Sequence, residues 1–135
     1  MDLVLHFNKK IINFVVEDIF ELQIIKDMQK IPVSVVINTY NAAKQISETL
    51  ESAKDFDEIV VCDMESTDNT VDIARKYGCK IVVFPKGQHN ICEPARDCAI
   101  HSARNEWVLV VDADEVIPAE LGEFILQLMK TQMEN

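Results

Sequence analysis

Two aspartates, one residue apart, follow a short apolar run and could bind a metal ion. The run at 108–111 is Val-Leu-Val-Val, and Asp112 and Asp114 come directly after it. An apolar run without alternation is typical of a buried strand in a parallel sheet. Residues two apart on a strand point to the same side, and paired carboxylates suit Mg²⁺ or Mn²⁺, with water and phosphate oxygens as further ligands. Alternatively, both aspartates are turn and helix-cap residues ahead of Pro118.

Polar residues also end two other apolar runs. The run at 33–37 leads into Asn-Thr-Tyr-Asn at 38–41, and the run at 58–62 leads into Asp63. Because the carboxyl ends of parallel strands meet at one edge of a sheet, where ligands bind in open α/β folds, we expect these residues to gather near Asp112.

The spacing of apolar and turn residues predicts strands and helices in alternation. The expected strands are 33–37, 58–62, 80–84 and 107–111, and the expected helices are 42–54, 69–77, 94–104 and 118–130. Asn41 would cap the first helix, Gly78 would close the second and Pro94 would open the third. This order predicts an α/β fold with a parallel sheet covered on both faces.

Residues 1–30 differ from the rest of the chain. Apolar residues from Phe7 to Met28 approximate a helical stripe with charges between them. We predict an amphipathic helix, or two with a break, ending near Lys30. Such a helix could pack on the domain, mediate self-association into a homo-oligomer or lie on a membrane surface. The predicted domains are a helical extension at 1–31 and a binding domain at 32–135.

The composition is that of an acidic globular protein. The chain has 135 residues, of which 48% are hydrophobic and 27% charged, and its formal net charge is −10. The length fits a single core domain. The charge argues against nucleic acid or anionic lipid as the main partner, although a nucleotide could bind if a metal offsets the charge.

Neither the cysteines nor the apolar runs indicate a secreted or membrane-spanning chain. The 4 cysteines form no C-x-x-C pair, so we expect a reducing cytosolic setting without disulfides. No apolar run reaches about 18 residues, the length of a transmembrane helix. Glu17, Asp18 and Glu21 interrupt the apolar N-terminal stretch, which is unlike a signal peptide.

Four segments, in this order, match one known family. They are Thr39-Tyr40-Asn41, Glu58 to Asp63 followed by Ser66 to Thr70, Pro94 to Ala99, and Asp112 with Asp114. From Val33 to about Glu120 the chain resembles the nucleotide-binding half of family 2 glycosyltransferases, and it looks like the bacterial branch that adds sugars to lipopolysaccharide core and related surface glycans. The resemblance implies the Rossmann-like GT-A fold, a mostly parallel sheet flanked by helices. It also implies metal-dependent transfer of a sugar from a nucleotide-diphosphate donor to a glycan or lipid-linked acceptor, in the cytoplasm or at the inner face of the membrane.

The resemblance also implies a role for each matching residue. Thr39 and Tyr40 would line the base pocket, with Asn41 beside them, and Asp63 would accept hydrogen bonds from the base or ribose. Arg96 would lie near the diphosphate or the sugar. Asp112 would contact the ribose side and share with Asp114 a divalent cation that bridges the diphosphate. Such a cation, Mn²⁺ or Mg²⁺, neutralises the charge that develops on a departing nucleoside diphosphate.

The chain departs from the family pattern in three places. Asp97 stands where the family usually has Asn, which adds negative charge beside Arg96. Met64-Glu65 stands where a Gly usually precedes Ser-Thr-Asp, so that turn has no glycine. The acceptor-binding half and its catalytic base would follow the D-x-D, but the sequence ends at Asn135. Glu115 and Glu120 are present after the D-x-D, but the catalytic residue stays unassigned.

We therefore expect a fragment of a longer transferase or a shortened homologue, truncated after the D-x-D region, which binds a nucleotide sugar better than it transfers one. The alternative is a non-catalytic GT-A-like module for binding or oligomerisation. A dinucleotide-binding domain is excluded because the turn after the strand at 33–37 has no G-x-G-x-x-G.

Overall fold

The computed structural model describes residues 2–7, 10–15, 30–85 and 93–134. The chain divides into two compact units, Met1–Lys30 and Ile31–Asn135. The larger unit contains a parallel sheet in the strand order β5-β4-β3-β6. Its strands are β3 (Ile31–Thr39), β4 (Phe56–Asp63), β5 (Lys80–Val83) and β6 (Trp107–Asp112). Its helices are α2 (Ile46–Ser52), α3 (Thr70–Lys76), α4 (Glu93–Ser102) and α5 (Ala119–Glu134).

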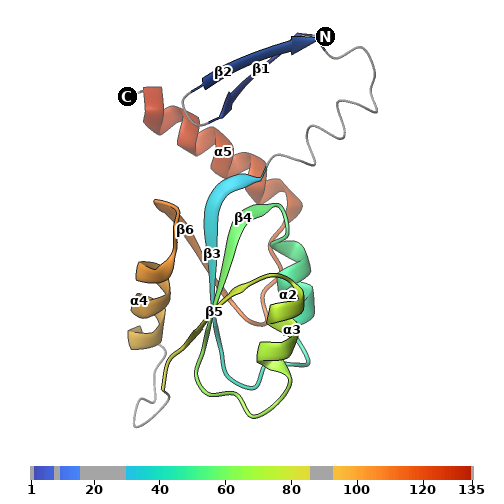
Figure 1. Cartoon of the computed structure of the whole chain (residues 1–135), viewed down its shortest axis with the longest axis vertical. Coiled ribbons are helices and arrows are strands. Elements are labelled where there is room, and N and C mark those ends of the chain that lie inside the picture. Colours follow the sequence, from blue (N-terminus) through green and yellow to red (C-terminus); the bar gives the residue numbers. More distant parts are fainter. Residues whose placement is uncertain (1, 8–9, 16–29, 86–92, 135) are drawn as a thin grey trace. The chain divides into compact units, whose positions relative to one another are not determined.

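The predicted alternation of strands and helices around a parallel sheet is confirmed. Figure 1 shows α4 on one side of the sheet and α2 and α3 on the other. The core divides accordingly: Val35 and Ile37 pack toward α2 and α3, and Val36 packs with Ala95 and Ala99 of α4. Burial of each such Val or Ile side chain contributes roughly 1.5–3 kcal/mol, which explains why β3 is apolar on both faces.

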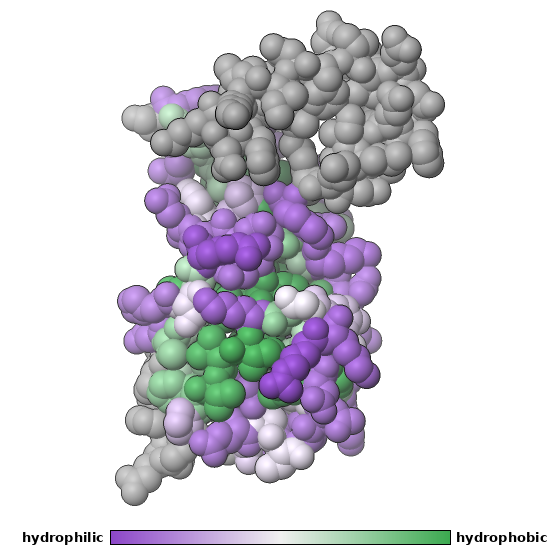
Figure 2. Space-filling view, in the orientation of Figure 1, coloured by the Kyte–Doolittle hydropathy of each residue, from purple (hydrophilic) through white to green (hydrophobic). Residues whose placement is uncertain are grey.

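The last helix, α5, joins the core through one side only. Leu121, Ile125 and Met129 are partly buried against the same cluster as α2 and α3. Phe124 and Leu128 are exposed on the same helix, at 56% and 43%. Figure 2 shows that hydrophobic residues reach the surface of the larger unit among hydrophilic ones. This unit therefore leaves apolar surface uncovered within the described residues.

The strand register brings the predicted polar residues to one edge of the sheet. Thr39 lies opposite Asp63 across β3 and β4, and Asn38 lies opposite Asp112 across β3 and β6. All three strands run in the same direction, so their carboxyl ends coincide. The sheet edge expected from the sequence is confirmed.

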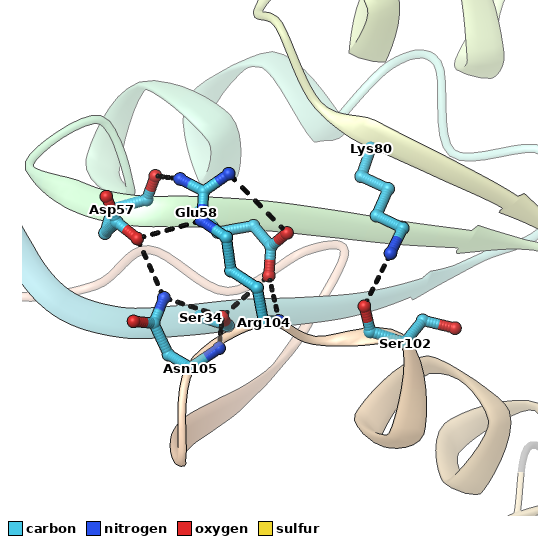
Figure 3. A network of polar contacts seen from close by, with 7 residues as sticks. All are labelled: Ser34, Asp57, Glu58, Lys80, Ser102, Arg104 and Asn105. Atoms are coloured by element: carbon cyan, nitrogen blue, oxygen red, sulfur yellow. Dashed lines mark hydrogen bonds and ion pairs between the residues drawn. The ribbon is translucent and has the colours of Figure 1, made fainter.

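A polar network fixes the amino ends of the same strands (Figure 3). Ser34 of β3 donates to the Glu58 carboxylate of β4 at 2.7 Å, and the Arg104 backbone N–H donates to the same oxygen at 2.9 Å. The Arg104 guanidinium reaches Asp57 at 3.1 Å, and Asn105 donates to Ser34 and to Asp57. Because Glu58 is only 8% exposed, this network satisfies a buried carboxylate and holds the turn before β6 in place.

Two local predictions have different outcomes. Gly78 closes α3 with φ of +76°, as expected for a C-terminal glycine. Asn41, predicted to cap a helix from residue 42, does not do so, because α2 begins at Ile46 and its N-cap is Gln45. Asn41 instead adopts φ of +50° and bonds to the loop after β4.

The predicted N-terminal helix is wrong over its first half. Residues Asp2–Phe7 and Lys10–Val15 form strands β1 and β2, an antiparallel pair in which Asp2 lies opposite Val15 and Phe7 opposite Lys10. β-branched residues such as Val4, Ile11 and Ile12 favour strands, and cross-strand pairing prevailed over the helical spacing of the apolar residues. The rest of the predicted helix, 16–29, lies outside the described residues.

Candidate functional site

Asp63 ends β4 with its carboxylate enclosed by neighbouring donors. The Thr39 hydroxyl donates to Oδ1 at 2.7 Å, and the Ser66 hydroxyl donates to the same atom at 2.6 Å. The Ser66 backbone N–H donates to Oδ2 at 2.8 Å. Thr39 and Asp63 are each 2% exposed. Both residues were predicted to face a nucleotide, and they form a hydrogen bond with each other at the carboxyl ends of β3 and β4.

Asn41 connects the loop after β3 to the loop after β4. Its backbone N–H donates to the Ser66 hydroxyl at 2.8 Å, and its side-chain Oδ1 accepts from the Thr67 N–H at 2.7 Å. The residue is exposed, as is its neighbour Tyr40, which is 45% exposed. Asparagine tolerates the left-handed conformation better than other non-glycine residues, which fits its place here.

Glu65 occupies the position where a glycine was expected. Its φ is +63°, so the turn does require a left-handed residue although no glycine is present. Holding a non-glycine residue there costs roughly 1–2 kcal/mol. The cost is offset by the bonds that the turn makes on either side, from Met64 N–H to Thr39 O at 2.9 Å and from Ser66 to Asp63.

A second set of bonds joins the same two loops one turn further on. The Ala42 N–H donates to Thr70 Oγ1 at 2.9 Å, and the Ala43 N–H donates to Asp68 Oδ2 at 3.2 Å. The Thr70 N–H and hydroxyl both donate to Asp68 Oδ1. The hydroxyl bond from Thr70 is the main reason that the pKa of Asp68 lies below its ordinary value. Ser66, Thr67, Asp68 and Thr70 were matched to the family by the sequence, but none was predicted as a site residue.

The metal-binding candidates lie where β6 turns away from the sheet. β6 ends at Asp112, and the Glu115 N–H donates to the Asp112 carbonyl at 3.0 Å, which closes a turn over 112–115. The Glu115 carboxylate accepts from the Asp112 N–H at 2.9 Å, and Thr49 of α2 donates to the Ala113 carbonyl at 2.8 Å. Strand alternation therefore does not extend to Asp114, although both aspartate side chains remain exposed.

Arg96 in the first turn of α4 reaches this edge from the other face of the sheet. Its guanidinium lies 3.9 Å from the Asp112 carboxylate, and the two side chains are 36% and 66% exposed. An exposed pair at this distance is weak, so a bound anion could compete for the guanidinium. Asp97, the departure beside it, is exposed on α4.

The carboxylates at this edge fit a hard divalent cation that a ligand helps to coordinate. In the part of the chain that the structure describes, no group of three or more His, Cys, Asp or Glu side chains is placed to hold a metal on its own. Asp112 and Asp114 are exposed and would supply oxygen ligands, and phosphate and water oxygens would complete the coordination. An open depression of about 480 Å³ is lined by Ser47, Glu48, Glu51, Ser52, Tyr77 and Val116, and by neither aspartate.

A parallel α/β sheet flanked by helices, with polar loops and two acids at its carboxyl edge, is the arrangement of the GT-A fold. The family model "Glycosyl transferase family 2" matches residues 34–134. The chain belongs to this family, and the predicted GT-A fold is confirmed. Within the described ranges, no helix combines the length and apolarity needed to cross a bilayer.

Known relatives support the family and are much longer than this chain. An uncharacterized glycosyltransferase of Rickettsia bellii is 36% identical over 108 residues, which cover 76% of this chain and 34% of that protein. The Escherichia coli UDP-Glc:alpha-D-GlcNAc-diphosphoundecaprenol beta-1,3-glucosyltransferase WfaP is 35% identical over 91 residues, 62% of this chain and 35% of its own. The chain thus spans about a third of the length of the curated relatives it matches.

Solved structures share the fold. Staphylococcus aureus TarS 1–349, also crystallised with UDP, matches with a TM-score of 0.65 and 32% identity, over 73% of this chain and 32% of that one. Mycobacterium tuberculosis glucosyl-3-phosphoglycerate synthase, crystallised with Mn²⁺, UDP and glucosyl-3-phosphoglycerate, matches with a TM-score of 0.55 and 24% identity, over 77% and 40% of the two chains. The second likeness shows the fold alone.

Proposed function

We propose that this chain is the donor-binding part of a glycosyltransferase that moves a sugar from a nucleoside diphosphate to a glycan or lipid-linked acceptor on the cytoplasmic side of a membrane. The observation that carries the proposal is the convergence of three strand ends, bearing Thr39, Asp63 and Asp112, on one edge of the sheet. The UDP complex of TarS and the UDP-glucose named for WfaP support a nucleotide-sugar donor.

The exposed residues of this edge have the chemistry that a nucleotide needs. Tyr40, 45% exposed beside the β3 end, offers an aromatic face to the base, and Asn41 lies next to it. Arg96 would move from Asp112 to the diphosphate, which carries more negative charge and accepts paired hydrogen bonds from a guanidinium. Asp112 would then face the ribose and the cation.

Asp112 and Asp114 would hold Mn²⁺ or Mg²⁺ between the chain and the diphosphate. When bound, the cation neutralises the charge that develops on the leaving nucleoside diphosphate. The requirement for it is electrostatic, because a chain of net charge −10 otherwise repels a diphosphate. Glu115 would orient the turn that carries both aspartates by accepting the Asp112 N–H.

Calorimetric titration of UDP and GDP, with Mn²⁺ and then with EDTA, tests this function. We expect one nucleotide to bind only with the metal, and Asp114→Ala to lower its affinity by at least about 10-fold. Asp72→Ala, which removes an exposed acid of α3, is the matched control and should bind as the unaltered chain does. Absence of binding to either nucleotide by the folded chain would instead favour a non-catalytic GT-A module.

A further inference from the structure

We propose that Asp63 acts in nucleotide binding as a positioning residue, which holds the two binding loops together, and that it does not contact the base or the ribose. The two loops are residues 39–43 after β3 and residues 63–70 at the end of β4. Together with the hydrogen bonds between them, they are called the clasp. The proposal rests on the proposed function, because it concerns the way in which the same edge of the sheet is made ready for a nucleotide.

The Asp63 carboxylate has little capacity left for a ligand. A carboxylate offers about four acceptor positions, and here three are taken by the Thr39 hydroxyl, the Ser66 hydroxyl and the Ser66 N–H. The residue is 2% exposed. A base or ribose that bonded to Asp63 would have to displace Thr39 or Ser66 and leave a polar group unpaired, which is unfavourable.

The bonds of the clasp pass from Asp63 outward to the exposed surface. Ser66 donates its hydroxyl to Asp63 and accepts the Asn41 N–H through the same oxygen. Asn41 in turn accepts the Thr67 N–H. Each step is a hydrogen bond of 2.6–2.8 Å, so the buried carboxylate fixes Asn41, and with it the adjacent Tyr40, through Ser66.

The clasp is held together by hydrogen bonds within the chain. Backbone N–H groups from both loops already have acceptors within the clasp, namely those of Asn41, Ala42, Ala43, Met64, Ser66, Thr67 and Thr70. A nucleotide would therefore meet loops that are already ordered, and binding would not carry the cost of ordering them. If the Asp63 hydrogen bonds were lost, the loops would have to be ordered when the nucleotide binds, and the affinity would fall.

A double-mutant cycle on UDP affinity with Mn²⁺ separates positioning from direct contact. If Asp63 acts through Ser66, then Asp63→Asn and Ser66→Ala each weaken binding by about 10-fold, and the double variant is little weaker than either single variant. If Asp63 touches the ligand, Ser66→Ala has little effect, or the two effects multiply to about 100-fold; either result overturns the proposal.

The chain offers a matched control for general loss of stability. Ser34 donates to buried Glu58 at 2.7 Å, and Thr39 donates to buried Asp63 at 2.7 Å, between the same two strands at opposite ends. We expect Thr39→Val to reduce UDP affinity and Ser34→Ala to leave it unchanged. Thr39→Ser keeps the hydroxyl and should retain more affinity than Thr39→Val. Equal losses of UDP affinity in Ser34→Ala and Thr39→Val would mean that the effect of Thr39 comes from general loss of stability, which would overturn the proposal.

Amide hydrogen exchange adds a test that needs no ligand. Without nucleotide, the Asn41 and Thr67 amides should be protected in the unaltered chain and should exchange at least about 10-fold faster in Ser66→Ala, whereas the amides of β3 remain unchanged. Unprotected amides in the unaltered chain would show that no clasp preexists. If the unaltered chain binds no nucleotide, the proposed function itself fails; if it binds and Ser66→Ala binds equally well, only this inference fails.

Discussion

At the scale of single residues, backbone strain is concentrated in the clasp. Asn41 and Glu65 are the described non-glycine residues with positive φ, and each lies in one of the two loops of the clasp. Non-glycine residues in this conformation persist where surrounding bonds fix them, and they are frequent at functional sites. The sequence departure at Glu65 is therefore tolerated at a cost, and that cost can be measured.

Glu65→Gly should stabilise the chain. Glycine removes the left-handed penalty of roughly 1–2 kcal/mol, but the greater freedom of the unfolded chain costs roughly 0.5–1 kcal/mol of stability, so the net gain should be up to about 1.5 kcal/mol. Urea unfolding measures the change in the free energy of unfolding. Glu48→Gly within α2 is the control and should destabilise by about 1 kcal/mol. A loss of stability in Glu65→Gly would mean that its side chain contributes more than the strain costs.

Asp68 should make the stability of the clasp sensitive to acid. The hydrogen bond from the Thr70 hydroxyl lowers the pKa of Asp68 from its ordinary value of 3.8. The ionised Asp68 carboxylate therefore contributes its full share of the folding stability above pH 3.8, and this share is lost as the pH falls through the lower pKa of the folded chain. The difference in unfolding free energy between the unaltered chain and Asp68→Asn should be constant at higher pH and shrink below pH 3.8. Asn69→Ala, a neutral change next to it, should give a difference that does not vary with pH, and a constant difference for Asp68→Asn would contradict the prediction.

At the scale of elements, β3 is the strand on which the larger unit is built, because other strands and both helix layers pack against it. It lies between β4 and β6, has a helix layer on each face, and carries a buried hydroxyl near each end, Ser34 and Thr39. Each hydroxyl is paired with a carboxylate of β4. The amino-end pair fixes the turn before β6, and the carboxyl-end pair fixes the clasp at the opposite end of the same strand.

The packing of α5 on β3 predicts a coupled pair of substitutions. A Cβ on Gly122 of α5 would lie 2.7 Å from Ile31 Cδ1, the flexible end of its side chain. Gly122→Ala gains about 1 kcal/mol of helix propensity, which the contact offsets. In an Ile31→Val background the contact is absent, so the same change should stabilise by about 0.5–1.5 kcal/mol more than in the unaltered chain. Additive effects in thermal unfolding would mean that Ile31 moves aside freely.

At the scale of the whole molecule, the chain matches only about a third of the length of its curated relatives. Large apolar side chains such as Val83 (61%), Val116 (57%) and Phe124 (56%) are exposed in the larger unit.

The two acids near the D-x-D are not placed for catalysis. The Glu115 carboxylate accepts a hydrogen bond from the Asp112 backbone, and Glu120 is exposed in the first turn of α5. Neither is supported as a general base, which must reach the acceptor hydroxyl.

Turnover by the isolated chain should therefore be absent or very low. With UDP-glucose, Mn²⁺ and the purified chain, we expect UDP release no faster than in the Asp114→Ala variant, even where calorimetry detects nucleotide binding. Binding and positioning alone provide only part of the catalysis, and neither Glu115 nor Glu120 is placed as a general base. Sustained, acceptor-dependent UDP release would contradict this expectation and would place the base within 135 residues.

The sequence by itself determined the order of strands and helices in the larger unit, the parallel sheet and the edge at which the candidate site residues gather. These follow from local pattern: apolar runs without alternation mark strands buried on both faces, and Gly78 marks a helix end that needs positive φ. The D-x-D was placed correctly at the end of β6 because a strand fixes where its following residues emerge.

Only the tertiary structure decided what the polar residues of that edge do. Asn41 could cap a local helix or bond to a loop 26 residues away, and the distant partner was chosen. Asp63 could face a ligand or bond to Thr39, 24 residues earlier, and the register of β3 with β4 decided for Thr39. The same applies to residues 2–15, where pairing of two strands replaced the predicted helix. Each polar group has several possible partners, and a local pattern contains no information about which distant one the fold brings within reach.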